Sequence, residues 1–285
     1  MGYFTNTAKT AVLLALLTAL VLWIGQFFGG YTGLAIALVF VLVFNGAMYW
    51  WSDKIVLWMY KAKEAPKGHE VIPVVREVAH KAGIPMPKVY LVESATPNAF
   101  ATGRSPSHSA VAVTSGIMSL LSEEELKGVI AHEVSHIKNR DTLIQTVAGV
   151  LAGVISYAAS MARWTALFGG FGGRDDNGGA GNLISLLVIG ILAPLIALIL
   201  QLAISRTREY LADASAAKMI HTGKPLASAL RKLDSANKSH PMQADSSHAA
   251  TSSLFIVNPF KRSFLFEMFS THPPIEKRIA RLEKA

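Results

Sequence analysis

The sequence of 285 residues contains no cysteine and is poor in charged residues. Without cysteine the chain has no disulfide, no thiolate metal site and no cysteine nucleophile, so any bound metal must be held by His, Asp or Glu. Charged residues make up 16% of the chain, whereas an average soluble domain carries about 25%. Hydrophobic residues reach 51%, and the mean hydropathy is +0.36. This balance indicates a membrane protein of one or two domains.

The net charge of +8 is the one compositional feature that could indicate a nucleic-acid partner. The sequence lacks, however, the basic stripe interleaved with aromatic residues that such a surface needs. Membrane proteins collect Lys and Arg in their cytoplasmic segments. We therefore attribute the excess charge to membrane topology, and we predict a lipid bilayer but no nucleic acid as a partner.

Four apolar stretches are each close to the roughly 20 residues that a helix needs to cross a bilayer. They cover about 11–28, 33–51, 143–168 and 183–204. A Gly29-Gly30-Tyr31-Thr32 turn joins the first two, which predicts a tight hairpin whose exit carries an aromatic belt. The first stretch could instead be a cleaved signal peptide, but no small-residue cleavage signal follows it and the next apolar run begins almost at once. We expect a retained anchor.

Positive charge predicts the orientation of these spans. Of the 27 Lys and Arg residues, 24 lie in the two polar segments 52–141 and 206–285. The positive-inside rule assigns both segments to the cytoplasmic side, and four spans would also bring both termini there.

The first polar segment contains signals for a helix and three short strands. Helical spacing covers Val71 to Ala82 and stops at Gly83-Ile84-Pro85. Alternation predicts strands over Lys88–Val92, Ala99–Thr102 and Ala110–Thr114. We predict an α+β, predominantly helical fold with a small antiparallel sheet. In the second polar segment, the composition of Ser235 to Ser253 predicts a loop.

A further helix begins at a capping box, with Ser122 as N-cap and Glu125 reaching back to it. This helix carries His132-Glu133-Val134-Ser135-His136. Residues four apart project from one helical face, so the two imidazoles can bind a single Zn²⁺. Glu133 lies beside the first ligand, where it can accept a proton from metal-activated water without coordinating. The alternative is a charged helix with two solvated histidines.

A catalytic zinc needs a third protein ligand and one open position. Glu209 is the best candidate, because it follows the fourth apolar stretch and lies on the same membrane side as the histidines. Asp213, one helical turn on, could accept the remaining N–H of a ligating histidine. The alternative is a helix end whose Arg206 and Arg208 anchor it at the membrane surface. Spacing alone leaves the two interpretations open.

The combination of His132-Glu133-x-x-His136 with Glu209-x-x-x-Asp213 resembles the HtpX family of membrane metallopeptidases, relatives of the CAAX prenyl endopeptidases. Pro97-Asn98-Ala99-Phe100-Ala101-Thr102-Gly103 and Thr271-His272-Pro273-Pro274 with Arg278-Ile279 are also similar to family signatures. The resemblance covers essentially the whole chain and implies a gluzincin-type domain with one Zn²⁺. It implies His132, His136 and Glu209 as ligands, Glu133 as general base, Asp213 as support, Asn98 as a holder of the substrate backbone and His272 as a stabiliser of the oxyanion.

The resemblance also implies the biological role. We expect an endopeptidase of a bacterial or archaeal cytoplasmic membrane that cleaves unfolded or damaged membrane and cytosolic proteins under stress, with its active site facing the cytoplasm. The expected organisation is a transmembrane hairpin (1–52), a first catalytic part (53–141), a second hairpin (142–205) and a second catalytic part (206–285).

Three other functions remain as alternatives. An intramembrane metalloprotease carries the same motif inside a spanning helix, but here Glu123 and Lys138 flank it with charge. A transporter or scaffold with a non-catalytic metal site would place ionisable groups within its spans. A processing protease for lipidated peptides is compatible with the family. An extended substrate could pair along either Ala99–Thr102 or Ala110–Thr114, and the sequence does not indicate which strand forms the edge.

Overall fold

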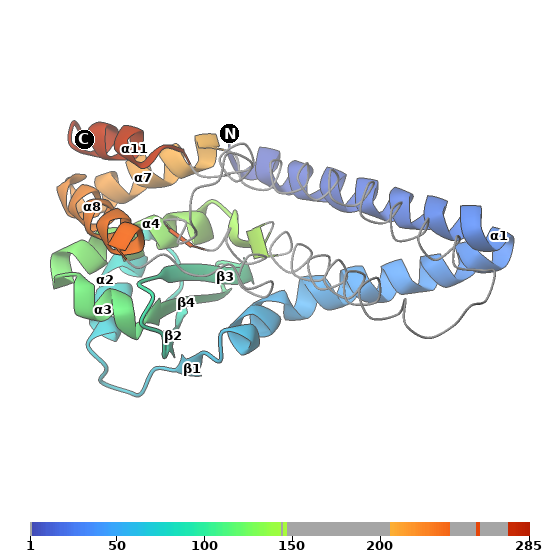
Figure 1. Cartoon of the computed structure of the whole chain (residues 1–285), viewed down its shortest axis with the longest axis horizontal. Coiled ribbons are helices and arrows are strands. Elements are labelled where there is room, and N and C mark those ends of the chain that lie inside the picture. Colours follow the sequence, from blue (N-terminus) through green and yellow to red (C-terminus); the bar gives the residue numbers. More distant parts are fainter. Residues whose placement is uncertain (1, 144, 147–205, 240–254, 257–272) are drawn as a thin grey trace, which may run out of the picture.

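A long helical hairpin extends from a domain in which a small sheet packs among helices (Figure 1). This arrangement comes from a computed structural model that describes residues 2–143, 145–146, 206–239, 255–256 and 273–285. Apart from residues 143, 145 and 146, the predicted third and fourth spans lie outside the described residues.

The hairpin is helix α1, which runs over Gly2–Met59 with one break at Gly30. Gly30 has φ 54° and ψ −143°, a conformation that glycine adopts without a side-chain penalty. Near this turn the arms touch, because a Cβ on Gly33 would lie only 2.2 Å from the carbonyl oxygen of Gly25. The first two apolar stretches therefore form the helical hairpin that their sequence predicts.

One part of the hairpin, Gly29–Trp51, is long and apolar enough to cross a membrane by length and composition. Its apolar side chains are largely exposed, as a helix surrounded by lipid requires; examples are Ile36, Val39 and Leu42. Within the described ranges no other helix meets this test, so the prediction of four spans is not confirmed.

The sheet contains β1 (Lys63–Glu64), β2 (Lys88–Val92), β3 (Ala99–Ser105) and β4 (His108–Thr114), in the order β1-β2-β4-β3. The three predicted strands are confirmed, whereas β1 is too short to give a sequence pattern. The prediction of a purely antiparallel sheet is wrong, because β2 pairs with β4 in parallel. After β2 the chain passes to the far side of β4, and β3 returns from there as its antiparallel neighbour.

Among the described residues, the strand order makes β3 an edge strand and β4 an interior strand. Helices α2 (Val71–Ala82) and α4 (Glu123–Lys138) pack with the sheet side chains that include Ala101 and Val113. The alternate side chains, including Phe100 and Ala112, pack with the end of α1. Because both faces are covered, β3 and β4 are apolar at successive positions instead of alternating with polar residues.

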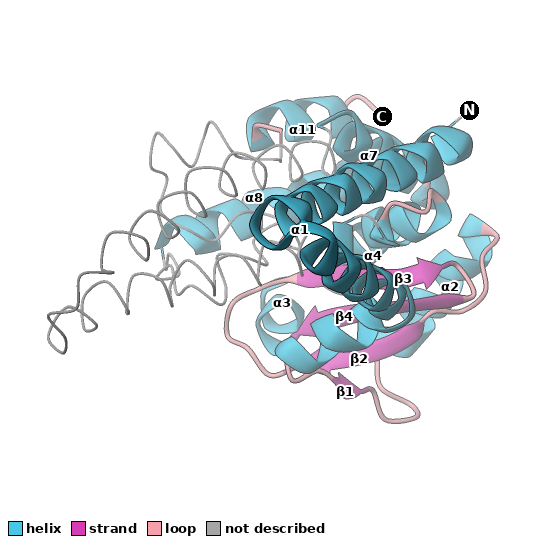
Figure 2. Cartoon of the chain, turned by 90° about the vertical axis from the view of Figure 1, so that its right-hand side faces the viewer, coloured by secondary structure: helices cyan, strands magenta, loops and turns pink. Residues whose placement is uncertain are grey.

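Helix α4 is central among the helices and contacts α2, α7 (Arg206–Ile220) and α8 (Lys224–Ser239). The remaining described helices are α3 (Ser115–Leu120) and α11 (Ile275–Leu282). Figure 2, viewed along the hairpin, shows α7 and α11 beyond the β3 edge of the sheet and β1 at the opposite edge. The predicted capping box of Ser122 and Glu125 is confirmed. The predicted loop is wrong over residues 235–239, which form the last turn of α8, and its remainder lies outside the described residues.

Candidate metal centre

The two motif histidines lie one turn apart on the buried side of α4. Their Nε2 atoms are 3.3 Å apart, and both side chains are almost fully buried. The solvated-histidine alternative is therefore wrong, because neither ring faces water. Two buried imidazoles whose Nε2 atoms face each other at this distance are suited to binding one cation between them.

Glu209, on α7, supplies the third donor group. Its Oε2 lies 3.6 Å from His132 Nε2, and its Oε1 lies 3.5 Å from His136 Nε2. Zn²⁺ with ligand bonds of about 2.0–2.1 Å in a tetrahedron places neighbouring ligand atoms about 3.3–3.4 Å apart. The observed separations, which run to the two different oxygens of Glu209, are close to this value, so the two imidazoles and the carboxylate fit a zinc centre.

The charges around these ligands also fit a divalent cation. Six further ionisable side chains, four acidic and two basic, are buried together with the histidines: Glu133, Asp141, Glu209, Asp213, Arg208 and Arg278. With both imidazoles neutral, the carboxylates exceed the guanidinium groups by two negative charges. A buried charge is stable only when it is paired or coordinated to a metal, and a divalent cation would neutralise this cluster.

Asp213 fixes the orientation of His132, as its spacing from Glu209 predicts. The Nδ1–H of His132 donates to Asp213 Oδ1 at 2.9 Å, which directs Nε2 toward the other ligands. Arg278 of α11 holds the same carboxylate through Nε at 2.9 Å and Nη2 at 2.7 Å. Burial alone would raise the pKa of Asp213, but Arg278 and His132 lower it to about 2, so Asp213 stays ionised.

Asp141 plays the corresponding part for His136, and the sequence analysis missed it. His136 Nδ1 lies 3.2 Å from Asp141 Oδ2, and Arg208 Nε lies 3.8 Å from Asp141 Oδ1. The end of α4 explains this position. Arg140 adopts φ 58°, and the backbone N–H of Asp141 donates to the carbonyl of His136, so a Schellman-type turn returns the chain to the last ligand.

Each histidine thus has an aspartate at its Nδ1 atom, and each aspartate has an arginine beside it. The partner of His136 was visible in the sequence as an acidic residue just beyond the helix end, five positions after the ligand. Arg208 was considered as a membrane anchor, and this interpretation is wrong because Arg208 is buried beside Asp141, whereas Arg206 is exposed.

Glu133 connects α4 to the edge strand of the sheet. The backbone N–H of Ala101 in β3 donates to Glu133 Oε2 at 2.9 Å. Burial raises the pKa of the Glu133 carboxyl above its usual range. A carboxylate with a raised pKa is better matched to proton transfer near neutral pH.

Asn98 lies at the start of β3 and is buried. Its backbone N–H donates to Thr114 Oγ1, and its side-chain Oδ1 accepts from the backbone N–H of Ile256 at 3.3 Å. Ile256 is also held by Arg278, whose Nη1 donates to the Ile256 carbonyl. The predicted site residue His272 lies outside the described residues.

Comparison with known proteins adds an independent finding. Residues 66–285 match the model of peptidase family M48. Proteins named protease HtpX homologue are similar over nearly the whole chain. The one from Syntrophotalea carbinolica is 51% identical over 278 residues, covering 98% of both chains. The one from Pyrococcus furiosus is 50% identical, covering 97% of this chain and 94% of its own.

A solved structure, that of Ste24p from S. mikatae, has a similar fold. The TM-score is 0.52 at 21% identity, covering 99% of this chain. The chain spans 66% of the length of that protein. At this level of identity the likeness concerns the fold alone.

The aspartate behind His136 gives a direct test of the centre. Replacing Asp141 with Asn removes the charged acceptor of the imidazole N–H and should weaken zinc binding by about 10- to 100-fold. Competition with a chromophoric chelator would measure this change. Asp234→Asn, in an exposed pair with Lys238, is the matched control and should bind zinc like the wild type. Equal affinity in Asp141→Asn and the control would contradict the assigned role.

Zinc uptake should also depend on pH in a defined direction. Burial alone would lower the pKa of His132, but its hydrogen bonds with Asp213 and Glu209 raise it to about 9. Since zinc binds the neutral imidazole, it must displace a proton below pH 9, and its apparent affinity should fall about tenfold per pH unit between pH 8.5 and 7.

In Asp213→Asn the partner that raises the pKa is lost, so the pH dependence over this window should flatten. Zinc titrations at several pH values would measure both slopes. A wild-type affinity that is the same at pH 7 and 8.5 would exclude the proposed proton displacement.

Proposed function

The chain belongs to peptidase family M48, and on this basis we propose how its metallopeptidase reaction proceeds and which proteins it cleaves. The proposed metal is one Zn²⁺ per chain, with His132, His136 and Glu209 as ligands. The observation that carries this assignment is the spacing of the three buried donor groups, which lie within 4.8 Å of one another. The donor types, two imidazoles and one carboxylate, are those of a catalytic zinc site.

A zinc ion held there would supply Lewis acidity, polarising the scissile carbonyl and making water a better nucleophile near neutral pH. Glu133 accepts the proton of the attacking water and then delivers it to the leaving amine. Its hydrogen bond with Ala101 keeps the carboxylate at the sheet edge, so little reorganisation is needed when a peptide binds. Asp213 and Asp141 keep the two imidazoles in the tautomer that presents Nε2.

The substrate is proposed to bind as an extended strand along β3. Of the two strands considered from the sequence, β3 is the edge strand and it also contacts the catalytic helix. Backbone pairing along an edge depends little on side chains, which suits a protease for many unfolded sequences. Asn98, buried at the start of β3, is proposed to hold the substrate backbone. His272 is proposed to stabilise the oxyanion by analogy with the family.

We propose that the physiological substrates are unfolded or damaged membrane and cytosolic proteins. The proposed setting is a bacterial or archaeal cytoplasmic membrane, with the four parts of the chain at 1–52, 53–141, 142–205 and 206–285 and the active site on the cytoplasmic side. The membrane-spanning character of Gly29–Trp51 and the distribution of Lys and Arg support this topology. The bilayer is a permanent partner, and no nucleic-acid partner is proposed.

The alternatives are less well supported. The relatives are named as proteases, which does not favour a transporter or a scaffold, and no observation singles out lipidated peptides as substrates. An intramembrane protease would need its motif helix in lipid, whereas Glu123, Glu124 and Lys138 at the ends of α4 are exposed and charged.

The general-base assignment is tested by Glu133→Gln, which keeps the size of the side chain but cannot accept the proton. Cleavage of an unfolded soluble protein in detergent should fall by about 10²- to 10⁴-fold, while the zinc content per chain stays at the wild-type value. Glu124→Gln changes an exposed residue on the same helix and serves as the control. A Glu133→Gln variant that keeps its zinc and cleaves at the wild-type rate would refute the proposed mechanism.

A further inference from the structure

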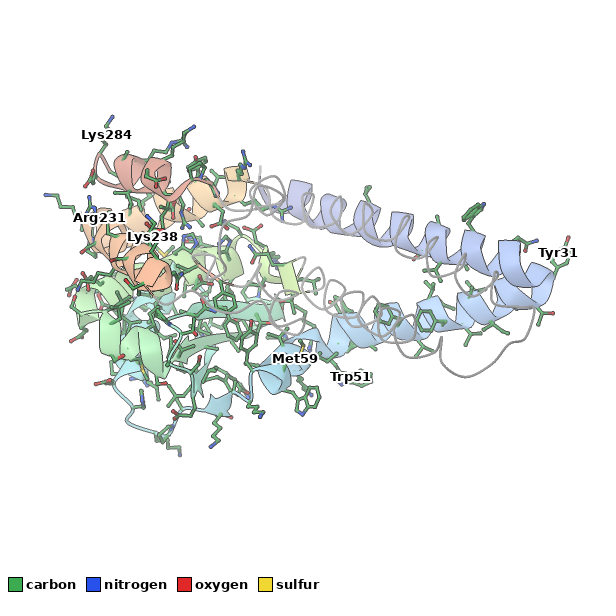
Figure 3. All side chains as sticks on the ribbon, in the orientation of Figure 1. Tyr31, Trp51, Met59, Arg231, Lys238 and Lys284 are labelled. Carbon is green, nitrogen blue, oxygen red and sulfur yellow. The ribbon has the colours of Figure 1, made fainter. Side chains whose placement is uncertain are left out.

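The second arm of α1 continues beyond the apolar segment without a break. The segment suited to the membrane, Gly29–Trp51, ends at Trp51, yet the helix continues to Met59. Figure 3 labels Trp51 and Met59 along this arm, with Tyr31 at the far tip of the hairpin. At about 1.5 Å per residue, Val56 lies about 8 Å beyond Trp51 along the helix axis. This extension is a rigid spacer, because it has helical geometry throughout.

The far end of the spacer is built into the sheet. Val56 is fully buried and belongs to the same apolar cluster as Phe100 and Ala112. Just after the helix, the ring of Tyr60 lies 4.9 Å from that of Phe100 in β3. These contacts pack the end of the spacer directly against the edge strand.

A second contact joins the edge strand to the start of the spacer. The guanidinium of Arg104, near the end of β3, lies 4.6 Å from the ring centroid of Trp50. Trp50 belongs to the last turn of the apolar segment, where aromatic side chains mark the membrane surface. The strand that contacts the catalytic carboxylate therefore also contacts the rim of the membrane anchor.

These contacts limit the distance between the active site and the end of the apolar segment. Ala101, whose N–H holds Glu133, is three residues before Arg104 in β3. A strand rises about 3.3 Å per residue, so the two residues are at most about 10 Å apart along it. With the length of the Arg104 side chain and its contact with Trp50 added, the catalytic carboxylate lies within roughly 25 Å of the end of the apolar segment. Both the helix and the strand hold this distance fixed.

We propose that the protein measures its cleavage position from the membrane. The preferred substrates are then polypeptide segments that directly follow a membrane span, and they are cut at a fixed distance outside the bilayer. An extended chain covers about 3.3 Å per residue, so cuts should cluster roughly 4–10 residues beyond the span. This inference rests on the proposed function, because it requires a peptidase anchored by α1 in a bilayer.

A reconstituted membrane substrate tests the proposal. The enzyme, loaded with zinc, and a single-span substrate are placed in the same phosphatidylcholine–phosphatidylglycerol vesicles. The span is followed by an unstructured repeat of about 60 residues in which every position is chemically equivalent, so that only distance distinguishes the peptide bonds. Mass spectrometry of the products gives the distribution of cuts. We expect a cluster in the first ten or so residues, and we expect about tenfold less cleavage when an uncleavable spacer of about 20 residues is inserted before the repeat.

Two pairs of variants test the spacer itself. Lys54→Pro breaks the helix between Trp51 and Val56, whereas Lys54→Ala at the same exposed position keeps it. Arg104→Ala removes the contact with Trp50, and Arg76→Ala removes an exposed arginine of α2 as its control. Lys54→Pro and Arg104→Ala should broaden the distribution of cuts about twofold or more while their controls keep it narrow. Lys54→Pro, Lys54→Ala and Arg76→Ala should cleave an unfolded soluble protein in detergent at the wild-type rate, because none of these positions lies in the strand proposed to bind substrate.

The possible outcomes distinguish the fixed cleavage distance from the peptidase function. Cuts spread evenly along the repeat, together with normal cleavage of the soluble protein, would overturn the fixed distance and leave the peptidase function intact. A narrow cluster that persists in both Lys54→Pro and Arg104→Ala would overturn the role of the spacer. Zinc-loaded enzyme that cleaves neither substrate would refute the proposed function and this inference with it.

Discussion

Burying charge in a protein interior is costly unless every group is paired, and this constraint organises the domain around α4 and α7. His132 and His136 can face Glu209 only because Asp213 and Asp141 accept their outer N–H groups, and because Arg278 and Arg208 lie beside those carboxylates. These seven residues come from α4, the turn after it, α7 and α11, so the C-terminal helix is tied to the same centre as the motif helix. The residual negative charge is what a divalent cation would neutralise, which links metal binding to the stability of the domain.

A second constraint couples this centre to the membrane. The sheet is covered on one face by α4 and α2 and on the other by the end of α1. Its strands therefore connect the hairpin to the metal centre. The bond between Ala101 and Glu133 makes β3 part of the catalytic machinery, while Phe100 and Arg104 bind the same strand to the anchor. An active site built this way has little freedom to move relative to its own membrane segment.

Local signals in the sequence predicted the local structure well. The limits of α2, the capping box at Ser122 and the strand Lys88–Val92 agree with the structure, because spacing, caps and β-branched residues act within a few positions. The motif histidines were found from their spacing, whereas spacing left Glu209 open and only the family resemblance assigned it as a ligand.

Features that depend on tertiary packing were not predictable in this way. The parallel pairing of β2 with β4 depends on where the chain passes β4, which no local pattern records. Asp141 was missed because only the left-handed turn at Arg140 brings it back to His136. The place of Arg208 beside Asp141 was not predicted, because its burial depends on α4.

The most direct measurement is X-ray absorption at the zinc edge of the metal-loaded protein, compared between the wild type and Glu209→Gln. The account predicts a four- or five-coordinate zinc with two imidazole ligands and one carboxylate at about 2.0–2.2 Å, and loss of the carboxylate contribution in the variant. A third imidazole, or a spectrum unchanged by Glu209→Gln, would contradict the assignment of a centre shared between α4 and α7.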